Sequence, residues 1–397
     1  MFDPNELIAL IDRDAVARDT LEFVRVESET GTEGPGSEFF AELLKREGLE
    51  PVLDHFEPDR PNVYAKLEGA EPEAGRSLML NGHVDTVPIG VSEPPALDDE
   101  WVVGRGAEDM KGGLVAIAHA ASAIKRSGLH LAGDLVISGV IGHETPIGQK
   151  EGPDRIIQLM QDGELAADAI VIAEGPKAIW AASAGCTGFK LTVTNPRGMI
   201  HNLYAPYDEN PARWLGEALR AFETWEDEFR SAPPSPLTGR EQVNVGILQA
   251  GDYVNRLPTP ASVIGTHRWQ PGTDEVDVQA RYEALCADLA DRSGLEVTVS
   301  FMGGGRAPFE IPASDPVIRA LQTGSRQVLG REAEIIGMQL VGDASLFANE
   351  IPVPSVYFGP GHGTAHSDNE RIRIDDLVDT ARVYALAAVE YCGLVGG

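Results

Sequence analysis

The sequence predicts an α/β fold in which a mostly parallel sheet carries helices on both faces and a smaller α+β domain is inserted. Three observations indicate this architecture. Between residues 62 and 174, short apolar runs alternate with patterns of helical spacing, as strands and helices do in α/β proteins. From residue 185 to 305 the expected order becomes β-α-β-β-α-β, which is typical of a ferredoxin-like unit. A chain of 397 residues also exceeds what one hydrophobic core usually serves, so two domains are expected.

The first elements of the larger domain are marked by apolar runs and by a helical stop signal. Leu114, Ile117 and Ala121 recur at helical spacing. The helical pattern stops at Ser127-Gly128, which is typical of a helix C-terminus. Four apolar runs have the length and composition of buried strands, and they lie at residues 63–65, 77–81, 135–141 and 170–173.

The inserted domain has its own series of predicted elements. We expect strands at 189–194, 243–248, 262–268 and 295–301 and helices at 210–225 and 274–289. The glycine run 303–305 is the predicted hinge back to the larger domain. A strand at 353–358 and a helix at 375–391 then complete that domain. The predicted boundaries are therefore 1–184 and 306–397 for the larger domain and 185–305 for the insertion.

The composition argues against several classes of partner. The formal net charge is −30, so nucleic acid and anionic membrane surfaces would repel the chain. No stretch approaches the roughly 20 apolar residues of a membrane span, and residues 1–6 do not resemble the start of a signal peptide. We therefore expect a cytoplasmic protein. Cys186, Cys286 and Cys392 are widely separated, which predicts neither a disulfide framework nor a thiolate metal site.

Histidine and carboxylate side chains mark a candidate metal site in the larger domain. His83, Glu144 and Glu174 each lie at or just past the carboxyl end of a predicted strand, where open α/β sheets bind ligands. Asp109 and His366 add a further carboxylate and imidazole. Such side chains bind zinc, manganese or cobalt in hydrolytic sites, and five of them in two overlapping sets can hold two metals around one water. Two divalent ions are therefore the predicted cofactors, with zinc the default and manganese or cobalt the alternatives.

Three motifs together resemble one family of enzymes. They are Gly-His-Val-Asp-Thr-Val-Pro at 82–88, Gly-Arg-Gly-Ala-Glu-Asp-Met-Lys-Gly-Gly at 104–113, and Ala-His-Ser-Asp-Asn-Glu at 365–370. Over nearly its whole length the chain resembles the dinuclear metallohydrolases that include acetylornithine deacetylase, succinyl-diaminopimelate desuccinylase, aminoacylase and the glutamate carboxypeptidases. This resemblance implies a catalytic domain that binds both metals and a lid domain that also forms a homodimer. It further implies cleavage of an amide-type C–N bond in a small carboxylate-bearing substrate, such as an N-acyl amino acid or a dipeptide.

The resemblance also implies which residue binds which metal. Asp109 is implied to be the carboxylate that bridges the two ions. His83 and Glu174 would complete one metal site, and Glu144 and His366 would complete the other. This assignment carries the family pattern over position by position.

Other roles implied by the resemblance concern catalysis and substrate binding. Asp85 resembles the catalytic carboxylate that orients His83 from behind the metal. In the lid, His201 resembles the histidine that reaches the substrate carbonyl across the dimer, and Asn255 resembles a further substrate contact. Arg268 resembles the clamp for a substrate carboxylate, a role that suits the planar fork of a guanidinium group.

His143 departs from the family pattern. The resemblance implies a Glu-Glu pair whose first glutamate moves a proton from the attacking water to the leaving amine, whereas this chain has His143-Glu144. A neutral imidazole can take the proton itself, so His143 is a candidate general base. Alternatively, His143 binds metal and changes the metal preferred, or the chain binds small molecules without turning them over. The sequence leaves these three interpretations open.

Further departures surround the predicted substrate. Residues 185–188 replace a more usual Arg-Gly turn, and the strand ending at Arg268 lacks the acidic residue that commonly lies two positions earlier. Residues 201–207 are also more aromatic than a typical small-residue segment. These changes leave open a substrate outside the familiar N-acyl amino acids, including a reaction that releases ammonia or an unusual amine.

Overall fold

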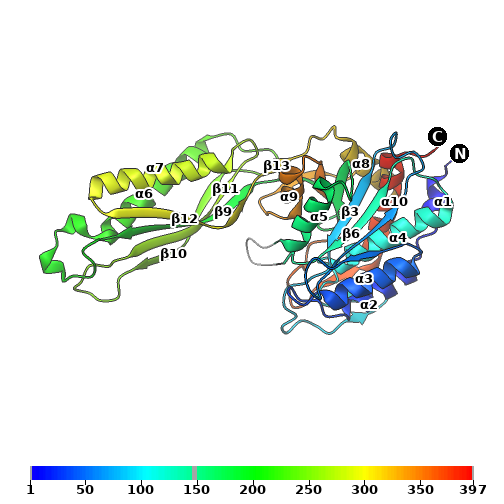
Figure 1. Cartoon of the computed structure of the whole chain (residues 1–397), viewed down its shortest axis with the longest axis horizontal. Coiled ribbons are helices and arrows are strands. Elements are labelled where there is room, and N and C mark those ends of the chain that lie inside the picture. Colours follow the sequence, from blue (N-terminus) through cyan, green and yellow to red (C-terminus); the bar gives the residue numbers. More distant parts are fainter. Residues whose placement is uncertain (1, 145–149, 396–397) are drawn as a thin grey trace. The chain divides into compact units, whose positions relative to one another are not determined.

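A computed structural model describes residues 2–144 and 150–395 of the chain, and it describes the backbone alone at 303–305 (Figure 1). The chain divides into two compact units. The first unit comprises Met1–Ala181, Ile311–Ile336 and Gly342–Gly397, and the second comprises Ala182–Glu310 and Gly337–Val341. The short segment Gly337–Val341 therefore joins the second unit, although it lies well beyond the insertion in the sequence.

The first unit is built on a mixed sheet with a parallel centre. Its strands follow the order β1-β2-β6-β3-β7-β15-β8, and β14 pairs with β8. The central strands β6, β3, β7 and β15 run parallel to one another, while the pairs at the flanks are antiparallel. The strand bounds are β1 (Val52–Asp54), β2 (Asn62–Leu67), β3 (Leu78–His83), β6 (Leu135–Val140), β7 (Ala169–Ile172), β8 (Ile179–Ser183), β14 (Ile335–Met338) and β15 (Ser355–Tyr357).

Helices cover both faces of this sheet, so the predicted fold class is confirmed (Figure 1). The helix over the sheet centre, α4 (Lys111–Ser127), is buried along most of its length, and Gly128 ends it with a left-handed φ of 72°, as the stop signal predicts. The other helices of the unit are α1 (Pro4–Ile8), α2 (Arg13–Val24), α3 (Gly34–Arg46), α5 (Glu151–Gln161), α8 (Pro316–Leu329), α9 (Asp343–Glu350) and α10 (Ile374–Cys392).

A small second sheet of the first unit has the strand order β16-β5-β4, with bounds β16 (Arg371–Arg373), β5 (Trp101–Val103) and β4 (Ala96–Leu97). It joins the segment before the 104–113 motif to the segment after the 365–370 motif. Two loops that are distant in sequence are thereby held side by side. Among the described residues, no helix has the length and apolar character needed to span a membrane.

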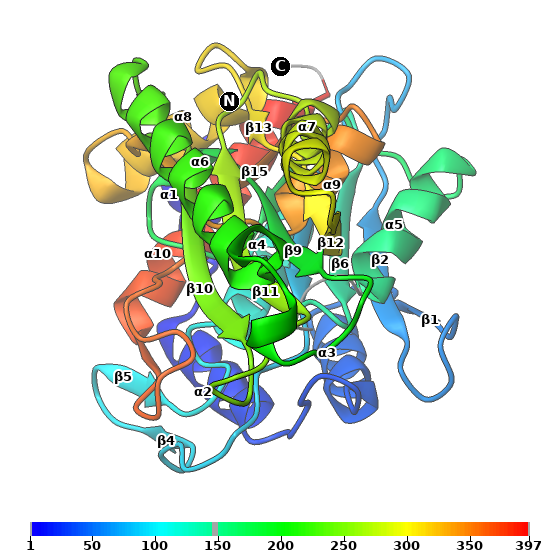
Figure 2. The same cartoon turned by 90° about the vertical axis from the view of Figure 1, so that its left-hand side faces the viewer.

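The second unit has the β-α-β-β-α-β order that the sequence predicts. Its sheet order is β10-β11-β9-β12, and α6 and α7 lie side by side on one face (Figure 2). The helix α6 extends beyond its predicted end, and β12 continues through the glycine run 303–305 that was predicted as a hinge. The bounds are β9 (Gly185–Thr194), α6 (Pro211–Ser231), β10 (Gln242–Ala250), β11 (Ala261–Trp269), α7 (Glu275–Ser293) and β12 (Glu296–Arg306).

The chain passes between the two units through strands. The short strand β13 (Phe309–Glu310) pairs antiparallel with β8, which carries the chain out of the first unit. The register of β12 against β9 is irregular between Met302 and Arg306. The outgoing and returning segments are therefore hydrogen-bonded to each other.

Candidate metal centre

The five predicted metal ligands belong to loops and strand ends of the first unit. His83 is the last residue of β3. Glu144 follows β6, and Glu174 follows β7. Asp109 lies just before α4, and His366 lies in the loop between β15 and β16. The parallel strands therefore deliver three of the side chains to one edge of the sheet, as their positions in the sequence predict.

Asp109 lies between the two predicted metal-binding histidines. Its Oδ1 atom is 3.1 Å from His83 Nε2, and its Oδ2 atom is 3.2 Å from His366 Nε2. Glu144 Oε1 is 2.9 Å from the same His366 nitrogen. One oxygen of Asp109 thus faces each histidine. His366 adopts a φ of 63°, which is uncommon for a residue with a side chain and is characteristic of functional sites.

Asp85 holds the backbone of the His143-Glu144 pair. Its carboxylate accepts hydrogen bonds from the backbone N–H of His143 at 3.1 Å and of Glu144 at 2.8 Å, and from the Thr30 hydroxyl at 2.9 Å. The nearest partner of His83 Nδ1 is the Asp85 backbone carbonyl oxygen at 2.9 Å, whereas the Asp85 carboxylate is 3.5 Å away. Asp85 therefore orients His83 mainly through its backbone, while its side chain fixes the pair.

A buried glutamate to which the sequence assigned no role fixes the loop of Asp109. Glu370 Oε1 accepts hydrogen bonds from the backbone N–H groups of Gly106 at 2.9 Å, Glu108 at 3.1 Å and Asp109 at 3.0 Å. The other carboxylate oxygen accepts a hydrogen bond from Arg105 Nη1 at 2.5 Å. Glu370 is only 1% exposed, so all of these bonds are shielded from water. One side chain thereby sets the path of the loop that carries Asp109.

Glu108 has the reciprocal role in the loop of His366. Its carboxylate accepts hydrogen bonds from Gly363 N–H at 2.9 Å, Thr364 N–H at 2.5 Å and the Thr364 hydroxyl at 2.8 Å. The side chain is buried. Each of the two loops thus supplies a glutamate to the backbone of the other. The sequence offers only one hint of this arrangement, which is that both glutamates lie within the specific motifs.

His143 lies against His83 and contacts Asp343. The two imidazole rings stack in parallel with centroids 4.2 Å apart. His143 Nδ1 is 2.7 Å from Asp343 Oδ2, and His143 Nε2 is 4.0 Å from Glu174 Oε2. Lys150 Nζ lies 3.6 Å from Asp343 Oδ1 and donates to the His143 backbone carbonyl. Asp343, the first residue of α9, is therefore the partner of His143.

The ionisable groups show that the site favours positive charge. Burial lowers the pKa of His83, but the hydrogen bond to Asp109 and the neighbouring carboxylates outweigh burial and raise this pKa well above its usual value. The hydrogen bond to Asp109 raises the pKa of His366 to about 10. Burial and the nearby charge of Asp109 raise the pKa of Glu174. A cluster that draws protons onto its histidines in this way would also attract metal cations.

The available donor atoms fit divalent metal ions. Glu174 Oε2 and His362 Nδ1 are buried without a hydrogen-bond partner among the described residues. Buried polar atoms without partners are rare, so each calls for an explanation, and a bound cation would provide one. At this site, three groups offer donor atoms that lie within 4.8 Å of one another: His83 with Asp109 and Glu144, Asp109 with Glu174 and His362, and His83 with His143 and Glu174.

The three predicted substrate contacts lie in the second unit. His201 is exposed and caps the short helix η1 (Asn202–Tyr204) with its ring nitrogen. Asn255 is also exposed, and its backbone carbonyl accepts a hydrogen bond from Asn202 N–H at 3.0 Å. Arg268 lies on β11 and donates to the Gln339 carbonyl at 2.5 Å. Their roles toward a substrate stay predictions.

Comparison with known protein families decides the classification. Residues 79–390 match the family described as peptidase family M20/M25/M40, and this span covers most of the chain and all five predicted ligands. The chain belongs to peptidase family M20/M25/M40. This result confirms the family that the three motifs predict. The protein is accordingly an enzyme of the M20 hydrolases.

Two curated relatives of this M20 chain differ in the compound that they are named for. One is the N-formyl-4-amino-5-aminomethyl-2-methylpyrimidine deformylase of Halalkalibacterium halodurans, which is 27% identical over 85% of this chain and 84% of its own length. The other is the succinyl-diaminopimelate desuccinylase of Burkholderia ambifaria, which is 26% identical over 81% of this chain and 85% of its own length. The chain is therefore similarly distant from relatives with different named substrates.

Solved structures of M20 proteins share the fold. Aminopeptidase PepT from Bacillus cereus aligns with a TM-score of 0.76 at 17% identity, over 96% of this chain and 99% of that one. A protein from Bacillus subtilis, described as a dinuclear metal-binding peptidase of the M20 family, aligns with a TM-score of 0.69 at 17% identity, over 95% of this chain and 97% of that one. At these identities the likeness shows the architecture and does not transfer a substrate.

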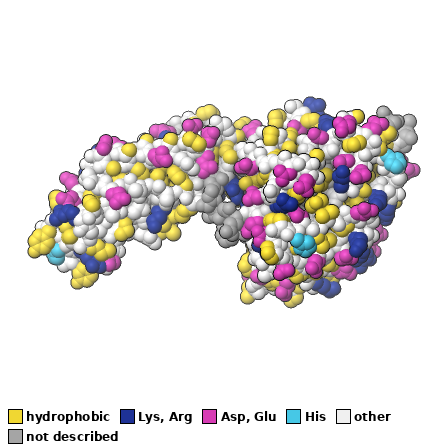
Figure 3. Space-filling view, in the orientation of Figure 1, with side chains coloured by type: hydrophobic (Ala, Val, Ile, Leu, Met, Phe, Trp, Pro, Cys, Tyr) yellow, Lys and Arg dark blue, Asp and Glu magenta, His cyan; other side chains and the backbone are white. Residues whose placement is uncertain are grey.

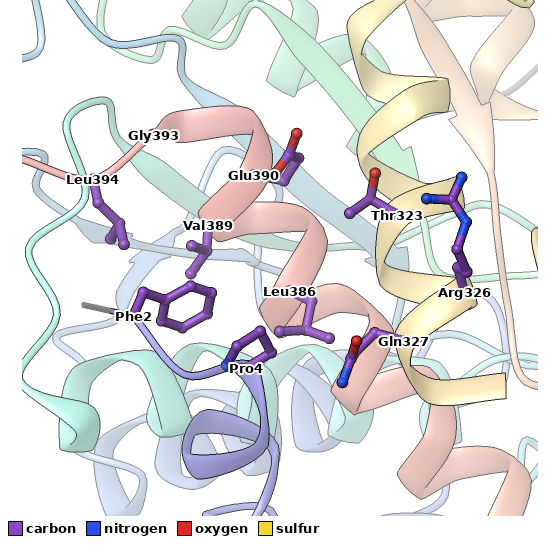
Figure 4. A pocket seen from close by; sticks show the side chains of 10 residues that line it. All are labelled: Phe2, Pro4, Thr323, Arg326, Gln327, Leu386, Val389, Glu390, Gly393 and Leu394. Carbon is purple, nitrogen blue, oxygen red and sulfur yellow. The ribbon is translucent and has the colours of Figure 1, made fainter. Parts of the chain in front are cut away.

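Another hollow of the first unit lacks the chemistry of the metal centre. It is bordered by α8, α10 and the N-terminal segment (Figure 4). Its described lining residues include no histidine or cysteine and combine apolar side chains such as Phe2 and Leu386 with polar ones such as Gln327. The strand ends therefore remain the candidate active site of this M20 enzyme.

Proposed function

We propose that the protein is a dinuclear metal-dependent hydrolase that cleaves an amide-type C–N bond in a small carboxylate-bearing substrate, such as an N-acyl amino acid or a dipeptide. The observation that carries the proposal is the position of Asp109, which has one carboxylate oxygen facing each of two histidines. Relatives named as a deformylase and a desuccinylase support the acyl–nitrogen bond as the bond that is cleaved.

We assign each metal ion to its own set of ligands. His83, Asp109 and Glu174 would hold one ion, and Asp109, Glu144 and His366 would hold the other. Zinc is the first choice because its usual ligands are histidine and carboxylate, with manganese or cobalt as alternatives. When bound, such ions lower the pKa of water and polarise a carbonyl group. The similarity of fold to the Bacillus subtilis protein described as a dinuclear metal-binding peptidase supports two metal ions per chain.

We assign the general base to His143. Its Nδ1 atom is engaged by Asp343, so Nε2 is the nitrogen left to exchange a proton with water and substrate. That nitrogen lies 4.0 Å from Glu174 Oε2, which places it beside the predicted metal ligands. In the reaction, Nε2 takes one proton from the attacking water and gives it to the leaving nitrogen, so the histidine ends in its starting state.

Homodimer formation is proposed for the second unit. The edge strand β10 exposes Ile247 and Leu248, which are 48% and 56% exposed, and Val254 beyond the strand is 97% exposed. Hydrophobic side chains are visible at the left-hand end of this unit in Figure 3. An unpaired strand edge with apolar side chains is suited to association with another chain. A second copy of the same chain is the partner that we propose for this surface.

The first test measures metal content and turnover together. Purified protein is incubated with zinc or manganese, analysed for metal, and assayed for release of primary amine from N-formyl, N-acetyl and N-succinyl amino acids and from dipeptides. We expect about two metals per chain and turnover of at least one of these compounds. One metal or none in folded protein would contradict the dinuclear site. Two metals without turnover of any compound would favour the interpretation of a binding protein.

The role of His143 is tested by substitution with alanine. If His143 is the base, His143→Ala should retain about two metals and lower kcat on the order of 10²–10⁴-fold. The exposed histidine His130 provides the control, because His130→Ala should change neither quantity. The grouping of His143 with His83 and Glu174 favours one alternative, in which His143 is a metal ligand. Loss of metal in His143→Ala that matches the loss of turnover would establish that alternative.

A further inference from the structure

We propose that Asp343 is a positioning residue that fixes the ring of His143 in the tautomer with its proton on Nδ1, and that Lys150 holds Asp343 in place. This inference rests on the proposed function in assigning His143 to the reaction. The contact between His143 and Asp343 exists independently of that assignment. It joins residues of two segments that lie far apart in the sequence.

The hydrogen bond between the two side chains determines the tautomer. His143 Nδ1 is 2.7 Å from Asp343 Oδ2, and the Asp343 side chain is 2% exposed. An ionised carboxylate can only accept hydrogen bonds, so Nδ1 must carry a proton. In the neutral ring the lone pair is then on Nε2, the nitrogen that lies toward Glu174. The hydrogen bond to Asp343 therefore favours one of the two neutral tautomers of His143 over the other.

Asp343 is held in its charged form by its surroundings. It is the first residue of α9, where the partial positive charge of a helix N-terminus favours an anion. Lys150 Nζ lies 3.6 Å from Asp343 Oδ1, and the same amine donates to the His143 carbonyl. Burial raises the pKa of Asp343, but His143 and Lys150 outweigh burial and keep this pKa below its usual range.

The backbone before α9 allows Asp343 to reach this place. A side chain at Gly342 would clash with the hydroxyl oxygen of the buried Tyr357, so this close approach requires glycine. The same hydroxyl accepts a hydrogen bond from Ala344 N–H at 3.0 Å. Tyr357 therefore fixes the first turn of α9 on both sides of Asp343.

The remaining freedom of the His143 ring is small. Its backbone N–H donates to Asp85, and its ring lies parallel to His83, with an angle of 3° between the planes. These contacts define the plane of the ring but do not determine which nitrogen is protonated. A glutamate at position 143 would not require this choice, because its two oxygens are equivalent when ionised. Replacement by histidine makes a partner such as Asp343 necessary.

The decisive experiment compares two buried aspartate–histidine pairs in the same chain. Asp343→Asn alters the pair at the site, and Asp19→Asn alters the pair formed by Asp19 and His119, in which the Oδ2–Nε2 distance is 2.9 Å. Long-range ¹⁵N–¹H spectra of protein labelled at histidine report the tautomer of each ring. The His143 signals are identified by their loss in His143→Gln.

We expect each substitution to act only on its own histidine. Asp343→Asn should reduce the fraction of His143 with its proton on Nδ1 and leave the His119 signals unchanged. Asp19→Asn should reduce the fraction of His119 with its proton on Nε2 and leave the His143 signals unchanged. On the best compound of the panel, Asp343→Asn should lower kcat on the order of 10²–10⁴-fold, with KM within about threefold and metal content unchanged. Asp19→Asn should keep the turnover of the unaltered enzyme.

Several outcomes would overturn the inference. Retention of both the His143 tautomer and kcat in Asp343→Asn, or a loss of metal in proportion to kcat, would show that Asp343 does not act by positioning. If Asp343→Asn fails to fold, Lys150→Met is the substitution that tests the inference. We expect it to lower kcat by about 3–10-fold at unchanged metal content. An unchanged kcat would contradict the inference. If His143→Ala keeps turnover while the spectra show the expected tautomer, the assignment of His143 as general base fails, whereas the role of Asp343 in fixing the tautomer of His143 stands.

Discussion

The two units bury different kinds of side chain. In the first unit, carboxylates such as Asp85, Glu108 and Glu370 are buried at the strand ends and accept several hydrogen bonds each. Among the described residues of the second unit, no carboxylate is buried; its buried polar side chains include Asn195 and His267, and its hydrophobic cluster includes aromatic residues such as Phe189 and Trp214. Burying a carboxylate costs free energy unless the group is paired. In the first unit, the hydrogen bonds that these carboxylates accept offset this cost and hold the loops that carry the proposed metal ligands. The second unit has a core that serves its shape, and its exposed strand β10 is the surface that we propose for association.

The largest expected effect comes from breaking the carboxylate network of the first unit. Glu370→Ala removes the acceptor of three backbone N–H groups, including that of Asp109. We expect the loop of Asp109 to shift, metal affinity to fall by about 10–100-fold and turnover to fall with it. Elemental analysis after dialysis at fixed metal concentration measures this loss.

Glu370→Gln is the matched control for this effect. Its amide oxygen can still accept the three N–H bonds, but it loses the charge that pairs with Arg105. Metal affinity should therefore lie between those of the unaltered protein and Glu370→Ala. Equal metal content in all three proteins would show that the loop is held by other contacts.

An intermediate effect is expected at the surface of the second unit, where association can be broken without disturbing the core. Leu248→Glu adds a charge to the exposed face of β10, and in a dimer this charge would face its own copy. We expect a shift from dimer to monomer in sedimentation velocity at micromolar concentration, with metal content unchanged. Val276→Glu places the same charge on α7, at a side chain that is 69% exposed. This control should leave the association state unchanged, and an unaltered protein that is already a monomer would refute the interface.

The sequence predicts the fold well because burial leaves a local pattern. The strands β3, β6 and β7 are buried along their whole lengths, and each appears in the sequence as a short apolar run. Boundaries are less predictable. The helix α6 continues to Ser231 because Phe229 extends the buried face formed by Phe222 and Trp225 beyond the predicted end at residue 225. The glycine run 303–305 predicts a hinge back to the larger domain, yet β12 continues through it.

Of the candidate metal centre, only the proposed ligands could be selected from the sequence. His83, Glu144 and Glu174 could be selected because strand ends and ligand chemistry are both visible in the sequence. The contact of His143 with Asp343 joins two segments 200 residues apart and leaves no local pattern. The bonds of Glu370 are made to backbone N–H groups, which every residue has, so no residue type in the partner loop signals them. Positioning contacts of this kind depend on the tertiary path of the chain.

The smallest expected effect concerns Asp19, a buried carboxylate of the first unit that lies among helices α2, α3 and α4. Its substitution tests whether every buried carboxylate of the first unit supports the proposed metal centre. Burial raises the pKa of Asp19, but its hydrogen bond to His119 and the nearby Arg46 and Arg18 outweigh burial and leave the pKa lowered from its usual value of 3.8. The folded state therefore binds its proton less readily than the unfolded state. The stability that this pair contributes is present above about pH 4 and is lost as pH falls through the lowered pKa.

Asp19→Asn removes the ionisable group while keeping its size, which isolates this contribution. Near pH 7 we expect the free energy of unfolding to fall by about 1–3 kcal/mol, because a buried charged hydrogen bond is lost. The difference between the two proteins should narrow as pH falls below about 4, because Asp19 then takes up its proton more readily in the unfolded state than in the folded state. Urea unfolding at a series of pH values measures the difference. A difference that stays constant down to pH 3 would mean that the charge of Asp19 contributes nothing. A loss of turnover in folded Asp19→Asn would instead show that buried carboxylates far from the strand ends also support the chemistry of the first unit.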